Sequence, residues 1–141
     1  MSLFNQILLL MCVLTLLSTH NSLRVNAYSS LFFQRMHVNV TNTLLENLDL
    51  TLHCKSADDD LGPHVLHHGQ NFVMNFKNNF LGETLFFCSF RWNKELHWFD
   101  IYIANRDDCR TTCNWYILQS GPCRTIAPKD NVECFAWNKN K

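Results

Sequence analysis

The sequence predicts an all-β fold, a small antiparallel β-sandwich of the immunoglobulin-like kind with about seven or eight strands, stabilised by disulfides. Three observations predict it. Apolar and polar residues alternate with a period of two in several segments, turn-forming residues interrupt them about every ten residues, and six cysteines follow residue 28. Because no helical segment is available to return the chain for parallel pairing, antiparallel neighbours are expected.

The chain begins with a segment typical of a secretory signal peptide. Residues 7–17 form an apolar run of about 11 residues, shorter than the roughly 20 that a spanning helix needs, and Val25-Asn26-Ala27 suits cleavage before Tyr28. We therefore expect residues 1–27 to be a signal peptide and residues 28–141 to form one domain, secreted to an extracellular location.

Four runs in the second part show the alternation most clearly. They are residues 48–54, 72–76, 86–92 and 97–104, in which apolar side chains occupy every second position. Such a pattern places one face of a strand against the core and the other against solvent. No run in this part has the period of an amphipathic helix.

Three further strands are expected from shorter patterns, at residues 38–41, 114–119 and 132–137. Between the strands lie clusters rich in Gly, Pro, Asn, Asp and Ser, which favour chain reversal. These expected turns are residues 55–63, 68–70, 77–79 with Gly82, 105–112 and 120–122.

The cysteine count indicates a disulfide framework. Cys12 would leave with the signal peptide, and an even set remains in an exported domain. Six cysteines allow fifteen pairings, and the sequence does not choose among them. The expected disulfide cysteines are Cys54, Cys88, Cys109, Cys113, Cys123 and Cys134.

Charge argues against two classes of partner. The chain has 12 basic and 12 acidic residues, and the signal peptide would remove only Arg24. Nucleic acids and anionic membranes select a dense basic face, which this balance does not provide. We therefore expect no nucleic-acid partner and no stable membrane insertion. The protein is also expected to be a monomer.

One glycosylation signal is present. Asn39-Val40-Thr41 fits the N-x-[ST] acceptor pattern, and alternation with Val38 and Val40 places Asn39 on the outward face of its strand. Asn39 is expected to carry a glycan and to sit at an exposed edge position.

Other polar clusters are better explained by structure than by chemistry. Asp58-Asp59-Asp60 lacks the alternating ligands and distal Glu of a helix-loop-helix calcium site, and Pro63 and Gly69 argue against a helix that would bring His64 and His67 together. Paired cysteines leave no thiolate nucleophile, and no hydrolase or phosphate-binding motif occurs. We expect no catalytic residues, no metal site, no cofactor and no enzymatic activity.

Several blocks together resemble the plant self-incompatibility S-protein homologue family, over roughly residues 36–138. The blocks are Leu52-His53-Cys54-Lys55-Ser56, Asp58-Asp59-Asp60-Leu61-Gly62, Asn79-Phe80-Leu81-Gly82, Thr84-Leu85-Phe86-Phe87-Cys88-Ser89-Phe90-Arg91-Trp92, Phe99-Asp100-Ile101-Tyr102, Arg106-Asp107, Cys113-Asn114-Trp115 and Gly121-Pro122-Cys123. The resemblance implies a secreted β-sandwich without catalytic activity, and for founding members a role as pistil ligands recognised by pollen.

The resemblance leads to the expectation of an extracellular signalling ligand that presents loops to a cell-surface receptor protein. The alternatives are a defence or toxin-like protein that acts on membranes, and a secreted hydrolase. Two charged loops, residues 55–62 and 105–112, are the expected recognition elements because loops carry specificity on rigid scaffolds. Their best partner-binding residues are Asp58, Asp59, Asp60, Arg106, Asp107 and Asp108.

Overall fold

The computed structural model describes residues 2–32, 35–79, 81–107, 109–126 and 131–139. The chain divides into two compact units, Met1–Gln34 and Arg35–Lys141. The first contains one helix, α1 (Leu3–Phe32), which includes the apolar run of the predicted signal peptide. No helix among the described residues combines the length and hydropathy of a membrane span. Cleavage before Tyr28 stays a prediction.

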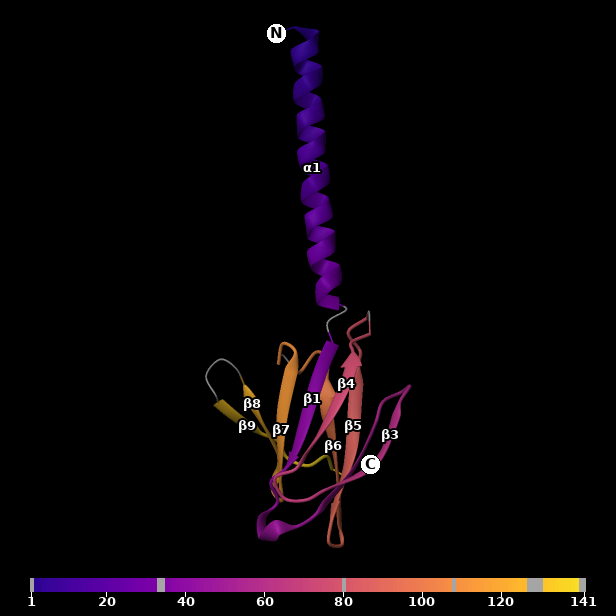
Figure 1. The fold of residues 1–141 in the computed structure, drawn as a ribbon, viewed down its shortest axis with the longest axis vertical. Helices are drawn as coiled ribbons and strands as arrows, with labels where there is room; N and C mark the ends of the chain where they lie inside the picture. The colour runs from indigo at the N-terminus through magenta and orange to yellow at the C-terminus, as the bar shows by residue number, and fades with distance from the viewer. Residues whose placement is uncertain (1, 33–34, 80, 108, 127–130, 140–141) are drawn as a thin grey trace. The chain divides into compact units, whose positions relative to one another are not determined.

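The second unit is a two-layer β-sandwich, which confirms the predicted fold class (Figure 1). Its elements are β1 (Arg35–Asn42), a 3-10 turn η1 (Leu45–Asn47), β2 (Leu50–Lys55), β3 (Asp60–Leu66), β4 (Asn71–Lys77), β5 (Leu85–Trp92), β6 (Glu95–Ile103), β7 (Thr112–Leu118), β8 (Gly121–Ile126) and β9 (Asn131–Cys134). One sheet has the order β4-β1-β7-β8-β9 and the other β3-β2-β5-β6. The described residues thus form nine strands, more than the seven or eight expected.

Alternating side chains of both sheets fill the core, as the period of two predicted. Phe90 and Ile101 from one sheet and Val38, Val40 and Trp115 from the other are all fully buried. The rings of Phe99 and Trp115 meet edge to face with centroids 5.2 Å apart. This arrangement stabilises an aromatic pair by more than the burial of its apolar surface alone. Contacts of this kind join the two sheets across the interior.

Two strands lie where the sequence predicted turns. The expected turn at residues 55–63 was wrong for its second half, since β3 starts at Asp60 and contains Pro63, and β8 starts at Gly121 in another expected turn. Pro63 is tolerated because β3 is an edge strand of its sheet, the position at which a residue without an N–H is accepted. At Gly121 a Cβ would overlap the Phe135 carbonyl, so the glycine permits close packing there.

One strand pair departs from the antiparallel expectation. β1 pairs with β7 in parallel, with Val40 opposite Trp115, whereas the other pairs are antiparallel. Parallel neighbours need a long connection, and here strands β2 to β6 supply it in place of a helix. The sequence offered no sign of this because β1 and β7 lie far apart along the chain.

The structure pairs all six cysteines of the sandwich as Cys54–Cys88, Cys109–Cys113 and Cys123–Cys134. Cys54 and Cys88 face each other across β2 and β5, and Cys123 and Cys134 across β8 and β9. The hallmark disulfide of antibody domains joins the two sheets, but none of these three does. The disulfide arrangement therefore differs from that of an immunoglobulin domain.

Candidate functional site

The two loops selected from the sequence lie at the same end of the sandwich. Lys55, the first residue of the first loop, pairs with Phe87 near the start of β5. Ile103, which precedes the second, pairs with Leu85 at the start of that same strand. The β4–β5 turn also enters β5 there (Figure 1). We call the described parts of the three connections, residues 56–59, 78–84 and 104–111, the loop end.

Asp60 is exposed, as expected, but its carboxylate is engaged within the sheet. Its oxygens accept hydrogen bonds from the Lys55 ammonium at 2.8 Å, from the backbone N–H of Gly62 at 3.0 Å, and from the His53 ring. The Lys55 hydrogen bond, followed by that from His53, holds the pKa of the Asp60 carboxyl well below its usual range. Asp60 therefore stabilises the β2–β3 pair.

Asp58 and Asp59 form the exposed tip of the same connection. Their backbone N–H groups donate to the Ser56 hydroxyl at 3.3 and 3.0 Å, and the Ser56 N–H donates to the Asp59 carbonyl at 2.8 Å. This is the local turn chemistry of serine. The two carboxylates enter none of the ion pairs of the described residues, so both remain available to a partner.

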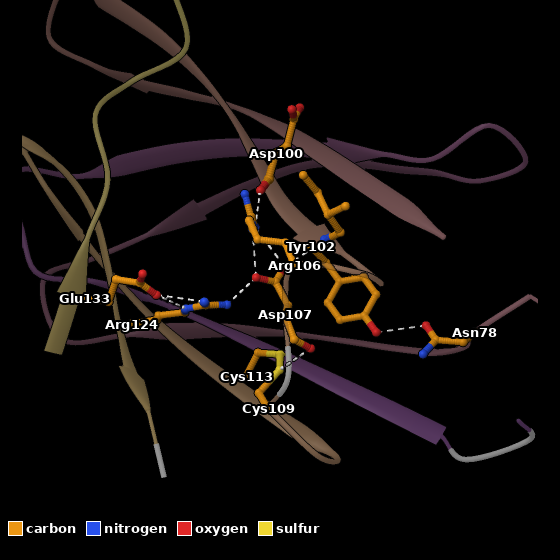
Figure 2. The surroundings of a disulfide bond; sticks show 10 residues. Asn78, Asp100, Tyr102, Arg106, Asp107, Cys109, Cys113, Arg124 and Glu133 are labelled. Carbon is orange, nitrogen blue, oxygen red and sulfur yellow. Dashed lines mark hydrogen bonds and ion pairs between the residues drawn. A yellow bond between two sulfur atoms is a disulfide. The ribbon is translucent and has the colours of Figure 1, made fainter. Parts of the chain in front are cut away.

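Asp107 does not fit the expectation of an exposed recognition residue. It is only 4% exposed. One carboxylate oxygen accepts from the Ile103 N–H at 2.7 Å and from Arg106 Nη2 at 2.8 Å, and the other accepts from Arg106 Nε at 2.8 Å and from Arg124 (Figure 2). The polar loop sequence suggested exposure, but the loop folds back over the end of β6. Asp108 lies outside the described residues.

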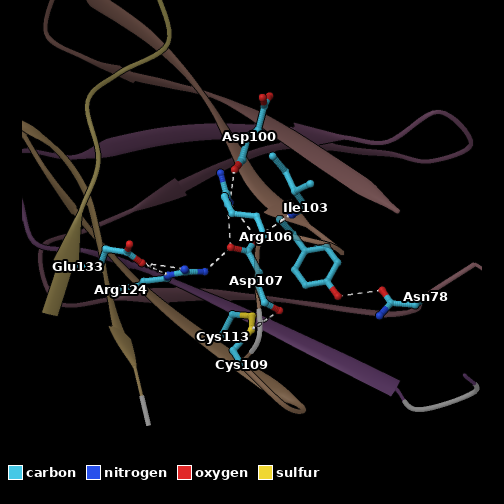
Figure 3. Close-up of polar contacts among 10 residues, drawn as sticks. Asn78, Asp100, Ile103, Arg106, Asp107, Cys109, Cys113, Arg124 and Glu133 are labelled. Carbon is cyan, nitrogen blue, oxygen red and sulfur yellow. Dashed lines mark hydrogen bonds and ion pairs between the residues drawn. A yellow bond between two sulfur atoms is a disulfide. The ribbon is translucent and has the colours of Figure 1, made fainter. Parts of the chain in front are cut away.

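Arg106 and Arg124 are also drawn inward, each at most a quarter exposed. Arg106 Nη2 donates to the Asp100 carbonyl at 2.7 Å, and Arg124 binds Glu133 through Nε and Nη2 at 2.9 and 2.7 Å (Figure 3). Both guanidinium groups lie 5.3 to 5.5 Å from the ring centroids of Trp115 and Phe135. We call Arg106, Asp107, Arg124 and Glu133 the arginine–aspartate cluster.

The arginine–aspartate cluster is suited to hold the backbone in place. Each oxygen of Asp107 already accepts two hydrogen bonds, which leaves little capacity to bind a substrate. Cation–π contacts with the aromatic rings further stabilise the two guanidinium groups. The cluster links the β6–β7 loop to β8 and β9 and so stiffens this part of the loop end. Arg124 and Glu133 could not be predicted as members of this cluster, because neither lies near Asp107 in the chain.

The β4–β5 turn forms the middle of the loop end. Asn79 organises it, since its N–H donates to Thr84 Oγ1 at 2.8 Å and its Oδ1 accepts the Glu83 N–H at 2.7 Å. Tyr102 donates to Asn78 Oδ1 at 2.9 Å, and burial raises the pKa of the phenol. The sequence predicted a turn here, but it did not indicate that this turn lies at the same end as the two loops expected to carry recognition.

Asn39 lies on the outer face of β1, as its alternation predicted, but β1 is an inner strand and not an edge. Its side-chain amide donates to Asn114 Oδ1 at 3.2 Å and accepts from Asn71 Nδ2 at 2.7 Å, so three asparagines bridge β4, β1 and β7. A glycan on Nδ2 would leave one N–H, and Nδ2 donates one bond here, that to Asn114.

We predict that Asn39 carries a glycan when the protein is made in a plant secretory host. The Asn39→Gln variant should then migrate faster than wild type, by one glycan, and glycosidase treatment should abolish the difference. Thr41→Ser, which keeps the sequon, is the matched control and should migrate like wild type. Equal mobility of wild type and Asn39→Gln, with no mass change on glycosidase treatment, would show that the site is unused.

Among the described residues, no group of three or more His, Cys, Asp or Glu side chains converges to hold a metal. The histidines instead bind local partners. His67 pairs with Asp49 at 2.7 Å, and His64 stacks on Phe72 with ring centroids 4.0 Å apart. These contacts account for the histidines as strand and turn residues.

Comparison with known proteins places the sandwich in a family. The sequence model for plant self-incompatibility protein S1 matches residues 37–137. S-protein homolog 2 of Arabidopsis thaliana is 42% identical over 110 residues, which cover 73% of this chain and 68% of the relative. S-protein homolog 5 of the same plant is 44% identical over 108 residues, covering 75% and 80%.

A solved structure has the same fold. It belongs to the SPH (Self-Incompatibility Protein Homologue) proteins, described as a widespread family of small, highly stable, secreted proteins from plants, and superposes with a TM-score of 0.57 at 16% identity, covering 76% of this chain and 97% of that one. The predicted secretion is confirmed at the level of the family. The chain belongs to the plant self-incompatibility protein S1 family, that of the S-protein homologues.

Proposed function

We propose that the protein is a non-enzymatic signalling ligand whose loop end binds a cell-surface receptor protein, with pollen and pistil recognition as one setting for this activity. The observation that carries the proposal is the contrast within the loop end. Asp58 and Asp59 are exposed and free of the described ion pairs, whereas Arg106 and Asp107, in the β6–β7 connection of the same end, are fixed in the arginine–aspartate cluster. A turn closed by its own hydrogen bonds to Ser56, with free charges at its tip, favours recognition, because little loop entropy is lost on binding.

Several features support a ligand over a hydrolase or a membrane-active protein. The six cysteines of the sandwich are paired, and the charged residues that cluster most tightly, Asp107 with Arg106 and Arg124, saturate one another. The near balance of basic and acidic residues offers no electrostatic attraction to anionic lipid.

Charge reversal at the tip tests the proposal. The Asp58→Lys/Asp59→Lys variant should bind plant protoplasts about tenfold more weakly than wild type, in a saturation assay with the fluorescently labelled mature protein, because complementary charge would become repulsive. Secretion, circular dichroism and melting temperature should stay near wild type, since exposed charges change stability by under about 0.5 kcal/mol.

The matched control makes the same charge change at the opposite end of the sandwich. Glu46→Lys/Glu95→Lys, in η1 and at the start of β6, should bind like wild type. Protease treatment of the protoplasts should remove binding, as a protein receptor requires. Undiminished binding of Asp58→Lys/Asp59→Lys would contradict the proposal and direct attention to the outer face of β5 and β6, where the rings of Phe87 and Trp98 lie 6.4 Å apart.

A further inference from the structure

We propose that a hollow at the loop end receives one basic side chain, an arginine or a lysine, of the protein partner. This inference rests on the proposed function and specifies the chemistry of the partner. The hollow has a volume of about 200 Å³ and lies between residues 56–59 and the β4–β5 turn. Small-molecule sites start at roughly 300 Å³, so this hollow suits a single long side chain better than a whole ligand.

The walls of the hollow are two hydrogen-bonded turns. On one side Ser56 closes the β2–β3 loop through its bonds to Asp58 and Asp59, and on the other Asn79 closes the β4–β5 turn through its bonds to Glu83 and Thr84. Both turns enter strands that belong to the packed sandwich. The hollow is therefore formed in the free protein, and a partner does not have to pay for its assembly.

Negative charge gathers around the hollow. Asp58, Asp59 and Glu83 line it, all three are exposed, and none enters an ion pair of the described residues. The acids that do form ion pairs do not line the hollow: Asp49, Asp60, Glu95, Asp107 and Glu133. Three carboxylates outside these ion pairs thus lie around one hollow, which favours a cation.

The apolar part of the lining distinguishes a basic side chain from a metal ion. Phe76, Leu85 and Phe86 contribute to the hollow, and the rings of Phe76 and Phe86 lie with centroids 4.5 Å apart. The described acids do not converge into a metal-binding group. Lysine and arginine carry an aliphatic stem below a charged head, so the stem matches the apolar lining and the head matches the carboxylates.

Lys77 is the one basic residue in the lining, and it makes the inference sharply testable. Its ammonium opposes a bound cation, but three carboxylates outnumber it. Replacing Lys77 by methionine keeps the stem and removes the charge. The variant should bind a basic probe more tightly than wild type, a gain that damage to the fold would not produce.

The probe is N-acetyl-arginine-methylamide, titrated into the ¹⁵N-labelled secreted protein and followed by NMR. Backbone amides of residues 56–59 and 83–86 should shift saturably. N-acetyl-citrulline-methylamide, of the same shape without the charge, should bind several-fold more weakly, as should arginine to Asp59→Asn/Glu83→Gln. Lys77→Met should tighten arginine binding about threefold, and Glu46→Gln should leave it unchanged.

Equal shifts with arginine and citrulline, or no tightening in Lys77→Met, would overturn the inference. The protoplast assay separates it from the proposed function. If arginine does not bind but Asp58→Lys/Asp59→Lys still weakens cell binding, the loop end is the receptor surface and the basic occupant is wrong. If arginine binds the hollow but cell binding survives the reversal, the basic site stands and the proposed receptor surface fails.

Discussion

Replacing Asp107 by alanine is expected to lower the free energy of unfolding by about 3 to 5 kcal/mol, the usual cost of removing one partner from a buried ion pair. Its carboxylate accepts hydrogen bonds from Arg106, Arg124 and the Ile103 N–H. Without it, two guanidinium groups stay largely buried against aromatic rings, and only Arg124 retains a carboxylate, that of Glu133. Such a loss is a large fraction of the roughly 5 to 15 kcal/mol that stabilises a domain.

Urea unfolding of the disulfide-intact protein measures this effect as a lower midpoint with an unchanged m-value. Asp58→Ala is the matched control, because it removes an exposed aspartate from the same end and should cost under about 0.5 kcal/mol. Asp107→Asn should fall between the two, since one oxygen remains as an acceptor while the new NH₂ faces arginine donors. Equal midpoints for Asp107→Ala and Asp58→Ala would show that the cluster does not hold the loop end.

The three disulfides are expected to contribute unequally. A bridge stabilises by restricting the unfolded chain, and the restriction grows with the length of the closed loop. Cys54 and Cys88 are 34 residues apart, whereas Cys109 and Cys113 are separated by 4. Chain entropy alone gives about 4 kcal/mol for the first bridge and about 2 kcal/mol for the second. Cys54 and Cys88 are also fully buried, so their truncation leaves a small cavity.

The double variants Cys54→Ala/Cys88→Ala and Cys109→Ala/Cys113→Ala test the order in thermal or urea unfolding. The first should lose the larger share of stability, with a melting temperature lower by more than 10 °C at about 4 °C or more per kcal/mol. Wild type under reducing conditions gives the lower limit. A larger loss from the Cys109 and Cys113 pair would contradict the loop-length explanation.

Much of the sandwich could be predicted because a strand with one buried face carries apolar side chains at every second position. In β5, for example, Phe86, Cys88, Phe90 and Trp92 are buried and alternate with partly or fully exposed residues, as the sequence indicated. The pattern fails where a strand contains turn formers. β3 and β8 each include a Gly-Pro pair, and only the neighbours in the sheet decide that these pairs belong to strands.

The candidate site could be predicted only in part, because some of its contacts join residues that are far apart in the chain. Asp58 and Asp59 lie in a local turn, whose exposure follows from local sequence. Asp107 is buried by Arg124, seventeen residues later in the chain, and no local pattern encodes that contact. The polar residue Asn42 is a similar case at the opposite end, where its fully buried amide donates to the carbonyls of Leu48 and Leu66.

Photo-crosslinking on intact cells tests most directly whether the loop end is the receptor surface. Benzoylphenylalanine would be placed at Ala57, an exposed residue beside Asp58, and separately at Lys94 in the exposed β5–β6 turn at the opposite end. After illumination of protoplasts, the Ala57 protein should form a covalent adduct with a cell-surface protein, and excess unlabelled wild type should suppress it. The Lys94 protein should form none. An adduct from Lys94 but not from Ala57 would contradict the proposed receptor surface.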